Sequence, residues 1–291
     1  MRVVMAYVAV VLIWTTTPLA IVWGSGSDWF YAVALRTLLG AMVLIPFAFW
    51  FGFHRRLQMN RAALKTYAYA VLPVFGGMTF MYWAGQYLPS GWIAILFATT
   101  PLMTGVIAHY LLPNSSFSVG KLAAIGLSLL GLIIIFAPNL EQSLASTQIL
   151  AILAAFASVF AHSLGTVLIK KSPLALSTLD TASVALIFSA LLYLMIAPQL
   201  MMPSTYPSLT ERQLAAIVYA ALVGSVVGFM LFFYLVKQLE PIKVAMIPVI
   251  TPLFAILLGH FLNNEPLGWD ILVGATLVVF GLILFQRQNR R

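Results

Sequence analysis

Few side chains of this sequence could do chemistry, and two of them are ionisable groups inside long apolar runs. Arg36 could be the counter-charge of a substrate carboxylate or a gate residue, and it could equally reach outward or bond to helix carbonyls. His162 could relay a proton, because imidazole titrates near neutral pH, or it could stay neutral and hydrogen-bond to a neighbouring helix. Both interpretations stay open for each residue.

Aromatic side chains and prolines also fall within apolar runs. Tyr82, Gln86 and Phe229 together supply aromatic rings and a few polar groups, which suits a pocket for a small amphipathic metabolite. Packing against lipid is the default for any single aromatic residue. Pro101 and Pro252 each remove a backbone hydrogen bond and free a carbonyl inside a run. We expect this pair to act as hinges. Kinks satisfied by neighbouring threonines are the alternative.

The sequence lacks the residues that most enzyme mechanisms require. It contains no Cys, which excludes disulfides, thiolate catalysis and cysteine-ligated metals. Its four isolated His residues make no His-Glu-x-x-His zinc site, no paired aspartates suit a diphosphate–metal complex, and no phosphate-binding Gly-rich loop with Lys occurs. We therefore expect no enzyme, no cofactor and no metal site. The alternatives are a membrane-embedded enzyme and a channel or passive facilitator, although no charged ring marks a channel.

The elements that position these residues must lie in a membrane. The chain has 291 residues, of which 62% are hydrophobic and 8% are charged, far outside the composition of soluble domains. The net charge of +8 comes from basic residues between the apolar runs, so we expect no nucleic-acid partner. The sequence predicts an all-α polytopic protein in a lipid bilayer.

Ten apolar runs are long enough to cross the bilayer, because a crossing helix needs about 20 residues. Their limits are 3–22, 29–51, 64–85, 91–112, 119–137, 147–168, 178–197, 213–236, 241–262 and 268–286. With the amino terminus inside, thirteen of the fifteen Lys and Arg residues fall on the inner side and only Arg212 falls outside. We expect a multi-pass protein of the bacterial inner membrane with both termini in the cytoplasm.

The two halves of the chain repeat each other. A shift of 151 residues aligns 88–111 with 239–262, and seven of the twenty-four pairs are identical, including Thr100-Pro101-Leu102 with Thr251-Pro252-Leu253. Five helices separate the copies, and because five is odd the second copy must enter the membrane from the opposite side. We expect five-helix repeats at 1–138 and 147–286, followed by a basic cytoplasmic tail at 287–291.

The chain resembles the EamA-like group of the drug/metabolite transporter (DMT) superfamily. The likeness rests on Trp14, on Leu35-Arg36, on the two Thr-Pro-Leu segments and on Asn264-Glu265-Pro266-Leu267, which is similar to the family's Gly-Glu turn. Asn264 in place of Gly, and Asn114 where a Glu is common, depart from the pattern and put a functional role for the loop carboxylate in doubt.

The resemblance implies a secondary transporter that exports small organic metabolites, such as amino acids or related neutral compounds, by alternating access. It also places the first, third, fourth, sixth, eighth and ninth helices around a central cavity. The expected substrate-binding residues are Trp14, Thr17, Tyr82, Gln86, Thr100, His162, Phe229 and Thr251, and the expected gating or hinge residues are Pro101, Pro252 and Arg36. We expect a small-molecule substrate, protons as the candidate coupling ion and no obligate protein partner.

Overall fold

The fold is that of a computed structural model, which covers most of the chain. It describes residues 2–26, 28–50, 58–112, 119–141, 146–172, 174, 176–202, 207–245 and 247–288, so Asn114 and tail residues 289–291 lie outside the described part. Within these ranges all regular structure is helical, and helices occur at each of the ten predicted spans. The predicted all-α fold class is confirmed.

The first half of the chain supplies five helical stretches, two of which are composite. They are α1 (Arg2–Gly24), α2 (Trp29–Trp50), the run of α4 (Arg61–Val71), η1 (Leu72–Gly77) and α5 (Met78–Ala84), the pair α6 (Ser90–Ala98) and α7 (Thr100–Leu111), and α8 (Val119–Glu141).

The second half repeats this order. Its elements are α9 (Ser146–Lys171), α10 (Thr178–Ile196), a short η2 (Pro198–Met201), the run of α11 (Glu211–Tyr219), η4 (Ala220–Gly228) and α12 (Phe229–Gln238), then α13 (Pro241–Ala245) with α14 (Ile247–Asn263), and α15 (Trp269–Gln288).

Six helical stretches are long and apolar enough, on length and composition alone, to cross a membrane: α1, α2, α6 with α7, α9, α10, and α11 with η4 and α12. Shorter apolar helices lie in α8, α14 and α15. Large hydrophobic side chains such as Leu12 and Met42 lie exposed on the outside of the bundle, as a lipid-facing surface requires. The protein is therefore a multi-pass membrane protein.

The third and eighth spans both contain a π-helical stretch at the same place in the repeat. η1 ends at Gly77 and η4 ends at Gly228, and these two glycines are 151 residues apart. A π-helical turn widens the helix locally and often occurs at functional sites. The two stretches thus mark equivalent points of the two halves, where a site between them would form.

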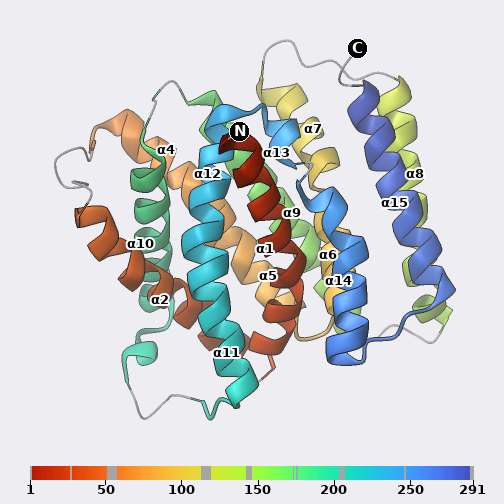
Figure 1. Cartoon of the computed structure of the whole chain (residues 1–291), viewed down its shortest axis with the longest axis horizontal. Coiled ribbons are helices and arrows are strands. Elements are labelled where there is room, and N and C mark those ends of the chain that lie inside the picture. Colours follow the sequence, from red (N-terminus) through yellow and green to blue (C-terminus); the bar gives the residue numbers. More distant parts are fainter. Residues whose placement is uncertain are drawn as a thin grey trace.

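The start of α1 and the end of α15 lie on the same side of the bundle. Figure 1 shows α1 beginning and α15 ending at the top of the view, as an even number of crossings requires. At one edge of the molecule α8 and α15 lie side by side, and the Ser128 hydroxyl donates to the Val278 carbonyl at 3.3 Å. The remaining helices pack together around the core of the bundle.

Candidate functional site

A cavity opens inside the bundle between helices of both halves. α1, α2, α5 and α6 line it from the first half, and η4, α12 and α14 from the second. About 40 Å³ of it is open to the centres of water molecules. The lining residues are Trp14, Thr17, Pro18, Ile21, Arg36, Met78, Ile93, Ala94, Phe97, Gly224, Phe229, Pro248 and Thr251.

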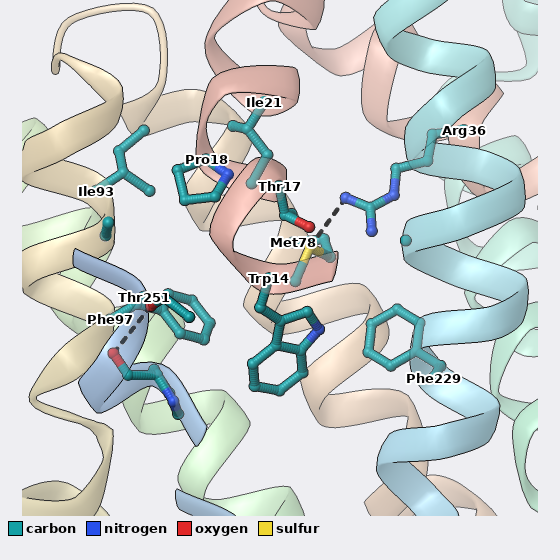
Figure 2. Close-up of a pocket in the computed structure, with 13 residues that line it drawn as sticks. Trp14, Thr17, Pro18, Ile21, Arg36, Met78, Ile93, Phe97, Phe229 and Thr251 are labelled. Carbon is teal, nitrogen blue, oxygen red and sulfur yellow. Dashed lines mark hydrogen bonds between the residues drawn. The ribbon is translucent and has the colours of Figure 1, made fainter. Parts of the chain in front are cut away.

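The guanidinium of Arg36 provides the charge of the cavity. Its side chain is 2% exposed, and its Nε donates to the Ser225 hydroxyl at 2.9 Å. Its Nη1 lies 3.2 Å from the sulfur of Met78, a weak acceptor. The guanidinium also lies 5.6 Å from the centroid of the Tyr82 ring. Figure 2 shows the group pointing into the cavity toward Met78 and Thr17.

Aromatic rings form much of the rest of the lining. Trp14 packs against Phe97 with ring centroids 6.2 Å apart, and both side chains line the cavity together with Phe229. Behind them lies His162, which is 2% exposed and packs against Trp14 and Phe97 at 5.4 Å each and against Phe232 at 4.8 Å. The Nδ1 atom of His162 has no hydrogen-bond partner among the described residues. His162 therefore supports the wall rather than lining it.

The carbonyls four residues before Pro101, Pro252 and Pro18 differ in whether a threonine hydroxyl bonds to them. The Thr100 hydroxyl donates to the Phe97 carbonyl, and the Thr251 hydroxyl donates to the Pro248 carbonyl at 2.9 Å. The hydroxyls near Pro18 instead donate to Val11 and Ile13 carbonyls. Pro18 supplies no N–H to the Trp14 carbonyl, and none of these three threonine hydroxyls donates to it.

Five of the predicted residues line the cavity and the others lie elsewhere. The five are Trp14, Thr17, Arg36, Phe229 and Thr251. Gln86 lies exposed beyond the end of α5, where its amide donates to the Trp83 carbonyl at 3.2 Å. Thr100 is buried at the start of α7, with its hydroxyl turned to its own chain. Tyr82 is fully buried and packs behind Arg36.

The two predicted hinge prolines lie in different contexts. Pro101 occupies the first turn of α7. That helix begins directly after Thr99, the residue that caps the end of α6, and a proline there leaves no backbone acceptor without its expected donor. Pro252 lies inside α14. Both are buried in the bundle. The repeat thus preserves the residue type but not the local helix geometry.

Met78 lines the cavity although it was not among the residues predicted from the sequence. Met78 and Phe229 are 151 residues apart and follow directly on η1 and η4, and Phe97 and Pro248 are separated by the same interval. All four line the cavity, which therefore uses equivalent positions of the two halves. The 151-residue shift that aligns the repeats could have identified these paired positions from the sequence, although the paired residues differ in type.

A second polar cluster closes the bundle at the end that the charge pattern assigns to the outside. The Glu265 carboxylate accepts hydrogen bonds from the Ser90 N–H at 3.0 Å, the Ser90 hydroxyl at 2.9 Å and the Gly91 N–H at 3.2 Å. Asn263 donates to the same carboxylate at 2.9 Å and accepts from the Trp23 indole at 2.8 Å. This Glu265 cluster joins the α14–α15 connection to the first turn of α6 and to the end of α1.

Asn264 explains how the connection folds. Its φ is 52°, in the left-handed region that Gly adopts freely and that Asn tolerates better than most residues. Asn in place of Gly therefore keeps the turn that presents Glu265 to α6.

Comparison with known proteins follows the same division of the chain. The model of the EamA-like transporter family matches residues 1–137 and again residues 149–287. The "Uncharacterized transporter YoaV" of Bacillus subtilis (strain 168) is 23% identical, over 97% of this chain and 96% of that protein. The "Protein PecM" of Dickeya dadantii (strain 3937) is 24% identical, over 71% and 68%. A solved crystal structure shares the fold, with a TM-score of 0.72 and 18% identity over 100% of this chain and 99% of the other.

Proposed function

The chain belongs to the EamA-like transporter family, and from this premise we propose that it is a secondary transporter that exports small organic metabolites by alternating access. The cavity between the two halves is the proposed substrate site. The observation that carries the proposal is the lining itself, which draws on Met78 and Phe97 from one half and on their repeat partners from the other. Two similar halves around one site can exchange inward-open and outward-open packings of comparable energy.

The inverted arrangement is part of the proposal. Five-helix repeats at 1–138 and 147–286, with both termini in the cytoplasm of a bacterial cell, place the Glu265 cluster on the outer side of the cavity. Breaking its bonds between α6 and the α14–α15 connection would then accompany opening toward the outside. The direction of export rests on the resemblance of the sequence to the family and on no feature of the cavity.

Reconstitution tests the transport function directly. Purified protein in proteoliposomes loaded with an unlabelled metabolite should take up the labelled compound by counterflow. Phe229→Leu, which reshapes the cavity wall, should slow this exchange several-fold. Phe254→Ala is the matched control, because Phe254 is 55% exposed on the outside of α14. Exchange that both variants leave unchanged would remove the cavity from the transport path.

Proton coupling is the proposed energy source, and His162 is its candidate residue. An imposed pH gradient should drive accumulation in the wild type and not in His162→Gln, while counterflow without a gradient should continue in both. The aromatic rings around His162 offer no counter-charge to an imidazolium. Equal gradient dependence in both proteins would end the role of His162.

A membrane-embedded enzyme and a passive channel are the alternative functions. Among the described residues no cluster of His, Cys, Asp and Glu side chains could hold a metal ion. A channel would conduct without saturation and without counterflow, so the same proteoliposome experiment separates it from a carrier.

A further inference from the structure

The cavity holds one positive charge that no described side chain neutralises. Within the described part of the chain the single ion pair joins Lys243 and Glu240, at 3.5 Å on exposed side chains. The described residues that line the cavity include no acidic one. The Arg36 guanidinium is therefore a buried cation whose hydrogen-bond partners are a hydroxyl and a thioether. Burying an unpaired charge in this way is costly.

The guanidinium also keeps donors that its described neighbours do not use. An Arg side chain carries five N–H groups in a planar fork, and Arg36 directs one toward Ser225 and one toward Met78. Its Nη2 lies beside Gly224, where a Cβ would approach to 3.1 Å. The absence of a side chain at Gly224 thus keeps room around the free edge of the fork, which faces the cavity (Figure 2).

Building on the proposed function, we infer that the transported molecule is a small organic acid whose carboxylate binds Arg36. The planar fork of a guanidinium matches a carboxylate and can bind it with two parallel hydrogen bonds. The apolar body of the acid then lies among Trp14, Phe97 and Phe229, and walls of this kind with one charged group define an oriented site for a small ligand.

The positive charge of the cavity also favours some acids over others. A monoanion neutralises Arg36 completely. A zwitterionic amino acid brings a second, positive charge, for which the described lining offers carbonyls and hydroxyls but no carboxylate. The substrate is therefore an acid without an amino group rather than the amino acid that the family resemblance implies.

Two matched sets of probes test this inference. The first is isovalerate, its amide isovaleramide and valine, which is isovalerate with an amino group. The second is 3-phenylpropanoate, 3-phenylpropanamide and phenylalanine. Binding is measured on the purified full-length protein as the rise in melting temperature with ligand concentration. We expect an acid to bind at least tenfold more tightly than its amide and than its amino acid.

Variants connect the preference to Arg36. Arg36→Gln should abolish the tenfold preference for the acid over the amide, and Arg36→Lys should restore part of it, because the charge returns without the fork. Arg212→Gln is the control, since this exposed Arg lies over the Trp23 ring at 5.2 Å, away from the cavity. If Arg36→Gln does not fold, Gly224→Ala crowds Nη2 and should weaken binding of the acid while sparing the amide.

Each contrary outcome has a distinct meaning. Equal binding of acid and amide by the wild type, binding of neither acid, or a preference that survives both Arg36→Gln and Gly224→Ala would overturn the inference. If chloride or phosphate raised the melting temperature as much as the acids do, the inference that the ligand is organic would be overturned. Saturable counterflow of valine or of an amide, without a preference for acids, would overturn the inference that the substrate is an acid. The proposal that the protein is a transporter would still stand. Failure of counterflow across a broad metabolite panel would instead overturn the proposed function.

Discussion

Two buried tyrosines differ in whether the hydroxyl has a hydrogen-bond partner, and this distinguishes a structural side chain from a candidate functional one. Tyr82 and Tyr193 are both fully buried. The Tyr193 hydroxyl hydrogen-bonds with the Thr79 hydroxyl at 2.7 Å, whereas the Tyr82 hydroxyl has no partner among the described residues. A buried polar group without a partner lowers stability, and a native protein keeps such a group where something else uses it.

The same substitution at the two tyrosines should therefore have different effects on stability. Tyr82→Phe should leave the melting temperature unchanged or raise it, because it removes an unsatisfied hydroxyl, while Tyr193→Phe should cost about 1 kcal/mol for the lost hydrogen bond. Thermal unfolding of the two purified variants measures the difference. A large loss of stability in Tyr82→Phe would mean that its hydroxyl has a partner in the folded protein.

Residue types predicted part of the cavity, and helix rotation decided the rest. Trp14, Thr17 and Phe229 are correctly placed in the lining, because their spans surround the centre of the bundle. Gln86 lies exposed because α5 ends at Ala84, before the helix reaches that residue. Thr100 turns to its own carbonyl. Sequence alone does not state which face of an apolar helix points inward, because all faces are apolar.

At the scale of elements, the Glu265 cluster holds two helices from different halves together. A carboxylate at a helix amino terminus accepts charge-assisted bonds from free N–H groups and interacts favourably with the helix dipole. Glu265→Gln keeps the shape and removes the charge, so it should lower stability by about 1.5–3 kcal/mol.

Glu240→Gln is the matched control for that prediction. Glu240 forms the exposed pair with Lys243, and such surface pairs contribute about 0–1 kcal/mol. Melting temperatures of both variants in detergent provide the comparison. If the two substitutions proved equally mild, the Glu265 cluster would not stabilise the closed outer end.

Glycines decide how closely α8 and α15 pack. A Cβ at Gly131 would lie 2.5 Å from the Gly274 carbonyl oxygen, and a Cβ at Gly274 would meet the Gly131 oxygen at the same distance. Gly131→Ala should therefore force these backbones apart and destabilise the pair by about 1–3 kcal/mol. At Gly126, on the same α8, a Cβ would meet no atom of another described element within 4 Å.

Gly126→Ala therefore serves as the control on the same helix. It should be neutral or stabilising, because Ala favours a helix over Gly by about 1 kcal/mol. Thermal unfolding and the yield of folded protein distinguish the two variants. Equal behaviour would show that the close approach of α8 and α15 does not depend on Gly131.

At the scale of the whole molecule, the sequence predicted the spans better than their interruptions. Hydropathy predicts a span because every backbone group in the bilayer must be satisfied within its helix. The end of α6 at Ala98 and the π-helical η1 have no such signal. The η1 stretch packs closely against a segment far along the chain, because a Cβ at Gly165 would lie 2.5 Å from Pro73.

The inverted arrangement of the halves has a direct test, because equivalent residues must face opposite sides of the membrane. Tyr87 and Gln238 are 151 residues apart, both exposed, and lie just beyond α5 and at the end of α12. The chain contains no Cys, so Tyr87→Cys and Gln238→Cys each introduce a single thiol.

A membrane-impermeant maleimide should label the Tyr87→Cys protein in intact cells and the Gln238→Cys protein only after permeabilisation, with the unmodified chain as the unlabelled control. This follows because the five crossings between equivalent positions are an odd number and carry the second thiol to the other side. Labelling of both from one side would contradict the inverted repeat. Labelling with the two sides exchanged would keep the repeat but place the termini outside, against the asymmetry of the Lys and Arg residues.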